Sequence, residues 1–202
     1  MSSSRTTVRQ YWVAIRAMLI FTVVLGVGYT AILTGIGQLV LPWQSNGSLV
    51  TVGGKVVGSA LIGQSFTDKK GKALPEWFQS RPSAAGTGYD ASASSGSNYG
   101  PENADLIKAV KERKAAIAKL DGVSPSSIPA DALTGSASGL DPHISPEYAL
   151  EQVARVAGAR NLSESAVNSL VESKIQLPDL GYLGEPRVNV VDLNIALASL
   201  KG

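Results

Sequence analysis

The most pronounced pattern in the chain is a long apolar run close to its N-terminus. Residues 17–41 read AMLIFTVVLGVGYTAILTGIGQLVL and include no charged side chain. A helix that rises about 1.5 Å per residue crosses the hydrocarbon core of a bilayer, about 30 Å, within this length. A secretory signal peptide is the alternative, but its apolar region would be about 7–15 residues long and would end in a small-residue cleavage site. The pattern therefore predicts an uncleaved transmembrane helix over residues 17–41.

The charges on either side of this run predict its orientation. Arg5, Arg9 and Arg16 precede it, and the next charged residue after it is Lys55. Basic residues close to a membrane span are retained on the cytoplasmic side. We therefore expect residues 1–16 to form a short basic cytoplasmic tail and residues 42–202 to form a domain outside the membrane.

Small and polar side chains recur at every fourth position within the apolar run. They are Thr22, Gly26, Thr30, Thr34 and Gln38, and we call them the small-residue stripe. A four-residue step keeps side chains on one side of a helix, where small residues let another helix approach and polar ones can bond across the contact. Glycine and threonine are also common in membrane helices generally, which is the alternative explanation. The stripe predicts contact with a membrane helix of a partner protein.

Beyond the apolar run, the pattern predicts a mixed α+β domain. Two short β-branched runs surround Gly53-Gly54 within residues 49–62, as in a hairpin, and residues 187–190 are predicted to be extended. The predicted helices are residues 102–120 with Gly122 as a cap, one that begins at Ser145-Pro146 and continues through Leu150, Val153 and Val156, one that begins at Ser163-Glu164, and residues 192–200. In the first of these helices, the stripe expected to be buried is Leu106, Val110, Ile117 and Leu120.

A segment rich in serine, alanine and glycine interrupts this pattern at residues 80–101. A flexible linker is one interpretation of such a composition. However, Arg81, Tyr89 and Asn98 break its monotony and favour an ordered irregular loop on the surface of the domain.

Composition excludes several classes of function. The chain has no cysteine and a single histidine, His143, so neither a disulfide framework nor a thiolate or multi-histidine metal site can form. The 18 basic and 16 acidic residues nearly balance, at a net charge of +2, so nucleic acid is not an expected partner.

No motif for catalysis or nucleotide binding is complete. The stretch Gly135 to Gly139 resembles G-x-S-x-G, but its central residue is Ala137. Asp141 and His143 flank Pro142, which suits a capped turn better than a catalytic triad. A phosphate-binding P-loop is missing as well. We expect no catalytic residue, no cofactor-binding residue and no metal ligand in this chain.

Several segments together resemble the C subunit of the Kdp-type potassium-transporting ATPase, the KdpC family. They are Gly58-Ser59-Ala60-Leu61-Ile62-Gly63-Gln64, Gln79-Ser80-Arg81-Pro82-Ser83-Ala84, Ser95-Gly96-Ser97-Asn98, Ala137-Ser138-Gly139-Leu140-Asp141, Arg155-Val156-Ala157 with Ala159-Arg160-Asn161, and Gly184-Glu185-Pro186-Arg187-Val188-Asn189-Val190 with Leu193-Asn194. Their order along the chain also fits. One departure is Gly158, where the family more usually has a large, often basic side chain.

The resemblance implies a non-catalytic subunit of an ATP-driven potassium importer in the bacterial cytoplasmic (inner) membrane. Its implied partners are a channel-like potassium-binding subunit, a P-type ATPase subunit, a small single-span subunit and the lipid bilayer. The complex is expected to use ATP, magnesium and potassium. The implied role is assembly of the complex, and a chaperone role that raises the affinity of the pump subunit for ATP has also been described for the family.

In the outer domain, the resemblance points to a small set of candidate contact residues. They are Gln79, Arg81, Ser95, Gly96, Ser97 and Asn98. A structural role for these residues, in which they satisfy the backbone of an irregular loop, is the alternative. For the whole chain, the other hypotheses are an anchored binding or adhesive module and an anchored enzyme.

Overall fold

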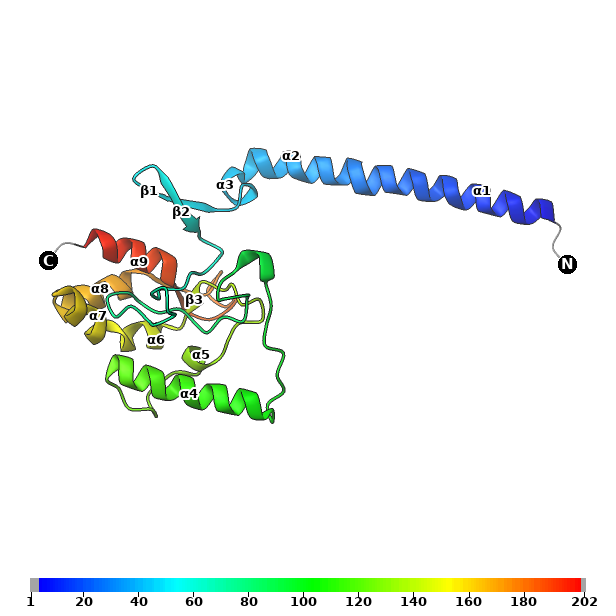
Figure 1. The fold of residues 1–202 in the computed structure, drawn as a ribbon. Helices are drawn as coiled ribbons and strands as arrows, with labels where there is room; N and C mark the ends of the chain where they lie inside the picture. Colours follow the sequence, from blue (N-terminus) through cyan, green and yellow to red (C-terminus); the bar gives the residue numbers. More distant parts are fainter. Residues whose placement is uncertain (1–3, 201–202) are drawn as a thin grey trace. The chain divides into compact units, whose positions relative to one another are not determined.

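The computed structural model of the chain describes residues 4–200, and they fall into two compact units, Met1–Leu49 and Val50–Gly202. The first unit is dominated by one long helix, and the second is a domain of short helices and strands (Figure 1). The prediction of one apolar N-terminal helix followed by a mixed α+β domain is confirmed at this level.

The long helix is continuous from Ser4 to Val40, in three segments. They are α1 (Ser4–Phe21), the π-helical segment η1 (Thr22–Tyr29) and α2 (Thr30–Val40). Residues Thr7–Val40 qualify as a membrane span by length and composition, and none of the most apolar window is buried inside the chain. The described part of the expected basic tail, residues 4–16, is thus helical and continuous with the apolar run.

The long helix ends in a turn that its own polar side chains close. Pro42 begins a short helix, α3 (Pro42–Ser45), and the side-chain nitrogen of Asn46 donates to the carbonyl of Pro42 at 2.6 Å. The same nitrogen donates to the side-chain oxygen of Gln38 at 3.0 Å, and Trp43 donates its indole N–H to the carbonyl of Leu49. Gln38 therefore has a partner within its own chain.

The predicted hairpin is present as β1 (Leu49–Val52) and β2 (Lys55–Ser59), which form a two-stranded sheet. Gly53 and Gly54 connect the strands with φ of +56° and +79°. Two consecutive residues with positive φ make the turn whose twist matches that of a hairpin, and glycine adopts it without strain.

The rest of the described domain contains a second sheet, six α-helices and the short 3-10 helix η2 (Ala91–Ala93), joined by irregular segments. The strands β3 (His143–Ile144), β4 (Ile175–Gln176) and β5 (Arg187–Asn189) are antiparallel in the order β3-β5-β4, with Ile144 and Ile175 both opposite Val188. The helices are α4 (Ala104–Asp121), α5 (Ala130–Leu133), α6 (Pro146–Glu151), α7 (Val153–Arg160), α8 (Glu164–Ser173) and α9 (Val190–Ser199). The helix α7 contacts both α4 and α8, and α9 packs on α8 (Figure 1).

The core lies between these helices and the three-stranded sheet. Its largest fully buried apolar side chains are Phe78, Val156, Val167, Val171, Val188, Val190, Val191, Leu193 and Leu197. Phe78 comes from the irregular segment that precedes α4, so the core depends on chain that forms no helix or strand of its own.

The structure corrects two predictions about helices. The stripe on α4 is not buried: Val110 and Ile117 pack against the core only partly, and no residue of α4 is fully buried. The helix expected to run on from Ser145 is interrupted at one residue, Gln152, which separates α6 from α7 and still has helical φ and ψ of −78° and −10°; Leu150 is exposed.

Candidate functional site

The candidate residue Gln79 belongs to an irregular segment, residues 74–81, which makes a turn at residues 75–76. Its side-chain amide donates to the carbonyls of Phe66, Leu74 and Trp77 at 3.0–3.2 Å. Its own backbone N–H and carbonyl pair with the side-chain amide of the buried Gln152. Gln79 is therefore fully occupied in holding irregular backbone in place.

The later helices hold the rest of this segment with buried polar side chains. Asn194 of α9 accepts from the N–H of Phe78 and donates to its carbonyl, both at 3.0 Å. Arg155 of α7 donates to the carbonyls of Pro75 and Trp77. Because a buried backbone group without a partner is costly, these side chains replace the pairing that a strand would provide. We call residues 74–81 the strap.

Arg155 also forms a buried ion pair with Asp121 at the end of α4. Burial raises the pKa of Asp121 although the Arg155 charge acts in the opposite direction. One oxygen of Asp121 and one of Glu151 are buried without a hydrogen-bond partner among the described residues. Burial and the charge of Asp121 raise the pKa of Glu151 as well.

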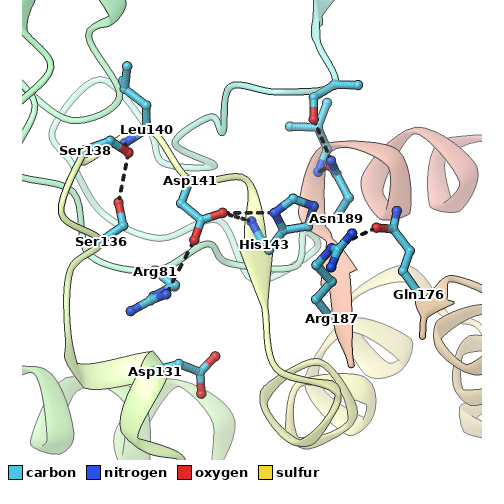
Figure 2. A network of polar contacts seen from close by, with 12 residues as sticks. Arg81, Asp131, Ser136, Ser138, Leu140, Asp141, His143, Gln176, Arg187 and Asn189 are labelled. Atoms are coloured by element: carbon cyan, nitrogen blue, oxygen red, sulfur yellow. Dashed lines mark hydrogen bonds and ion pairs between the residues drawn. The ribbon is translucent and has the colours of Figure 1, made fainter. Parts of the chain in front are cut away.

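The candidate residue Arg81 lies at the end of the strap, and Figure 2 shows how Asp141 joins it to His143. Asp141 accepts from the Arg81 guanidinium at 3.5 Å with one oxygen, and its other oxygen contacts the N–H and Nδ1 of His143 at 3.0 and 2.9 Å. Arg81 also donates to the carbonyl of Thr134. The expected capped turn at residues 141–143 is confirmed.

The pKa values of two side chains in this cluster are shifted in opposite directions. Burial raises the pKa of Asp141, but the hydrogen bonds from His143 and the charges of His143 and Arg81 outweigh it, so the net shift is downward. Burial raises the pKa of Tyr89 to about 12, and its hydroxyl donates to the carbonyl of Arg81 at 2.9 Å. At neutral pH the cluster thus combines a cationic Arg81, an anionic Asp141 and a neutral phenol.

Glycines bring two loop segments, residues 95–96 and 137–139, into close contact beside this cluster. A Cβ on Gly139 would lie 2.6 Å from the carbonyl oxygen of Ser95, and Gly139 has φ of +68°. A Cβ on Gly96 would lie 2.8 Å from the carbonyl oxygen of Ala137. The N–H of Ser95 donates to the carbonyl of Ser138 at 3.0 Å. Residues 80–101 are therefore an ordered irregular loop packed on residues 137–141, as predicted.

The remaining loop candidates, Ser97 and Asn98, lie at the surface. Both side chains are exposed, and Asn98 has φ of +53°, a conformation that asparagine tolerates better than most residues. Ser95 and Gly96 thus serve the packing of the loop, whereas Ser97 and Asn98 are presented to solvent. Their role as contact residues stays a prediction.

The small-residue stripe lies along the exposed surface of the long helix. Thr22 and Gly26 fall within the π-helical segment and Thr30, Thr34 and Gln38 within α2, and all five are exposed. A Cβ on Gly26 would meet nothing closer than 4.0 Å. Because a π-helix has wider turns than an α-helix, a four-residue step falls short of a full turn in η1 and overshoots it in α2, so the stripe drifts in opposite directions in the two segments. The stripe is open to a partner but winds differently in its first half.

The polar groups around Arg81 join the end of the strap to the loops at Thr134 and Asp141. The Asp141 carboxylate orients the imidazole of His143 through Nδ1, yet among residues 7–200 no serine or threonine hydroxyl is hydrogen-bonded to that ring. No group of three potential metal-ligating His, Asp or Glu side chains is found among the described residues. The polar groups here fix loops that carry exposed side chains.

Comparison with known proteins identifies the family. The family model for KdpC, "K+-transporting ATPase, c chain", matches residues 11–199. The chain belongs to the KdpC family.

Individual relatives agree with this assignment over nearly their whole length. A potassium-transporting ATPase KdpC subunit of Kineococcus radiotolerans is 51% identical over 95% of this chain and 94% of the relative. Those of Caulobacter vibrioides and Mycobacterium tuberculosis are 54% and 48% identical, over 91% and 95% of this chain and 90% and 99% of the relatives. The loops and the strap described above all lie within the matched region of the KdpC family.

Sequence reasoning missed one surface of this KdpC-family chain, the turn at residues 177–183 between β4 and β5. Its four large apolar side chains are strongly exposed: Leu177 (72%), Leu180 (81%), Tyr182 (74%) and Leu183 (50%). Leu180 has φ of +56°, unusual for a leucine, and Asp179 pairs with Leu183 across the turn. The available signal was a group of apolar residues among turn formers, Pro178, Gly181 and Gly184, where polar residues are usual.

Proposed function

We propose that this chain is a non-catalytic accessory subunit of an ATP-driven potassium importer and that it holds the complex together. The observation that carries the proposal is the match to the c chain of a K⁺-transporting ATPase over residues 11–199. The site supports it, because Gln79, Arg81 and Asp141 are engaged in shaping surface loops. The proposed partners are the channel-like subunit, the P-type ATPase subunit and the small single-span subunit.

The proposed topology is a single span with the N-terminus in the cytoplasm. Arg9 and Arg16 lie at the beginning of the candidate span Thr7–Val40, and basic residues favour the cytoplasmic end. Residues 50–202 then lie outside the bacterial cytoplasmic membrane. This placement favours assembly over direct contact with cytoplasmic ATP.

Two surfaces are available to hold partners. The small-residue stripe lies on a helix whose most apolar window has no buried residue within the chain, so lipid or another helix must cover it. The 177–183 turn is exposed in the second unit, and apolar groups in such a cluster are typical of a protein contact. We assign the stripe to membrane helices of the channel-like subunit and the turn to the part of that subunit outside the membrane.

The test is co-purification of the complex from native membranes in mild detergent, with a potassium-stimulated ATPase assay on the eluate. Thr22→Leu, Gly26→Leu and Thr30→Leu together should reduce recovery of the partners about tenfold, because bulky side chains prevent close helix approach. The matched control is Val23→Leu, Val27→Leu and Ala31→Leu, which should leave recovery unchanged. In the second unit, Leu180→Ser with Tyr182→Ser should also reduce recovery of the partners about tenfold, because it removes two exposed apolar side chains of the 177–183 turn.

Other outcomes favour the competing hypotheses. If the stripe variant retained its partners, the membrane part of the proposal would be wrong. If the complex stayed intact in all variants while the KM for ATP rose, the chaperone role would be favoured over assembly. If the wild-type chain were recovered alone, an anchored binding or adhesive module or an anchored enzyme would replace the subunit hypothesis.

A further inference from the structure

A cleft in the second unit lies beside the strap and is lined in part by basic groups. Its volume is about 690 Å³, within the range of about 300–1,000 Å³ typical of small-molecule sites. The lining comes from the turn at residues 71–73, the end of the strap, one face of α4, α5 and α6. The basic side chains that line it are Lys72, Arg81, Arg113 and Lys119, and no acidic side chain is part of the lining.

Three of these four cations have no acidic partner among the described residues. Arg81 is paired with Asp141, but Lys72, Arg113 and Lys119 form no ion pair there. Arg113 donates from one nitrogen to the carbonyl of Leu133 at 2.8 Å, which fixes its position and leaves its other N–H groups available. Like charges that converge without counter-charges repel one another, and an anion between them relieves that repulsion.

The lining of the cleft includes a polar group that has no hydrogen-bond partner among the described residues. Tyr148 of α6 is 3% exposed and lines the cleft, and its hydroxyl forms no hydrogen bond with any residue in the part of the chain that the structure describes. Burial is the first cause that raises its pKa, and the charges of Asp121, Glu151 and Asp131 on the adjoining elements act in the same direction, while Arg155 opposes them. The hydroxyl is therefore a donor that a bound acceptor can satisfy.

The rest of the lining is apolar. Ala116, Ile117 and Leu120 follow one another at helical spacing on α4, and Ala132 and Pro82 face the same space. The second half of the apolar stripe of α4, Ile117 and Leu120, is thus part of one wall of the cleft. A site with cationic and apolar walls selects a ligand that carries both an anionic group and hydrocarbon.

We propose that this cleft binds a phosphate-bearing organic anion. Lys72, Arg113 and Lys119 hold the phosphate, the Tyr148 hydroxyl donates to an oxygen of the ligand, and the hydrocarbon part lies on α4. The chemistry is shared by two sources, the headgroup of an anionic phospholipid and a soluble phosphate ester. The inference does not depend on the assembly role.

The experiment uses the full chain, ¹⁵N-labelled, in nanodiscs of neutral phosphatidylcholine. One arm adds about 10% phosphatidylglycerol to the discs, and the other titrates inorganic phosphate and then glycerol 3-phosphate into neutral discs. The expected result is a set of saturable amide shifts at residues 72, 113, 116, 119 and 148 in at least one arm. Shifts in the phosphatidylglycerol arm alone identify a lipid headgroup, and shifts in the soluble arm identify a free phosphate ester.

Three kinds of variant test separately the lysine charges, the Tyr148 hydroxyl and the space beside Ala116 in the proposed binding site. Lys72→Gln with Lys119→Gln should weaken binding about tenfold, because two charge-assisted contacts are lost. The control with the same change of net charge is Lys108→Gln with Lys111→Gln, on α4 but outside this cleft, and it should change the affinity less than about twofold. Tyr148→Phe should weaken binding about fivefold without loss of folding, since its hydroxyl has no internal bond to lose. Ala116→Phe should block the hydrocarbon part and leave inorganic phosphate binding intact.

Two results would overturn the proposal. One is the lack of saturable shifts at these residues in both arms with a folded wild-type chain. The other is an equal loss of affinity in the Lys72/Lys119 variant and in the Lys108/Lys111 control, which would mean that binding depends only on the net charge of the domain.

Discussion

The Asp141 carboxylate joins Arg81 to the turn before α6, and its effect on stability should depend on pH. Its pKa is lowered in the folded chain, so the ionised carboxylate contributes stability above about pH 4 and loses it as pH falls through the folded-state value. Asp141→Asn should therefore lower the unfolding free energy by about 1 kcal/mol at pH 6 and by progressively less towards pH 3.

This dependence can be measured by denaturant unfolding of the detergent-solubilised chain at several pH values. Trp77 reports on the strap once Trp12 and Trp43 are replaced by phenylalanine. The control is Glu102→Gln, an exposed carboxyl without an ion pair among the described residues, which should show no such trend. A difference between Asp141→Asn and wild type that stays constant from pH 6 to pH 3 would contradict the prediction.

A single methyl group should have opposite effects at two glycines. Gly139→Ala should destabilise the domain by about 1–3 kcal/mol, because φ is +68° and the new Cβ would collide with the backbone of Ser95. Gly158→Ala should stabilise it by about 0.5–1 kcal/mol, because nothing lies within 4 Å and alanine is the better helix former. Thermal unfolding of both variants beside wild type tests the contrast. Equal changes in melting temperature would contradict the prediction and show that the segments at Gly139 and Ser95 can move apart without cost.

At the scale of elements, the strap is held by side chains of later helices. Asn194→Ala should lower the unfolding free energy by about 2–4 kcal/mol, since two buried hydrogen bonds are lost and the N–H and carbonyl of Phe78 are left without partners. Asn168→Ala on α8 is the matched control, because its amide bonds with the exposed Glu172. Urea unfolding should show a small change for the control, and a similar change for both variants would mean that the strap is held by apolar packing.

Helix ends could be predicted from the sequence, because capping residues lie within one turn of the helix that they cap. Ser145 and Ser163 cap α6 and α8, and Gly122 ends α4 with φ of +71°, because capping depends on residues within one turn. Long-range polar pairs could not be predicted: Arg81 meets Asp141 60 residues later, and Phe78 meets Asn194 116 residues later. Periodicity also cannot show whether an apolar stripe meets a core or a cleft, which is why α4 was expected to be buried.

At the scale of the whole molecule, the division at Leu49 predicts independent folding of the second unit. Residues 50–202 contain the strap, both sheets apart from Leu49, and all of the core. A chain of residues 50–202 should therefore unfold cooperatively with a melting temperature within about 3 °C of the same transition in the full chain. Circular dichroism and calorimetry check this, and a fragment without a cooperative transition would show that the first unit is needed for folding.

The strap has a consequence for biosynthesis. Residues 74–81 leave the ribosome long before Gln152, Arg155 and Asn194, whose side chains provide the partners for its backbone. Chains are made from the N-terminus, so the strap, which forms no helix or strand of its own, must wait for the last helix to be translated. A nascent chain that ends before α9 has its apolar helix complete and its strap unpaired. Proteases and chaperones at the membrane would thus encounter this chain after its apolar helix is complete and before its domain has folded.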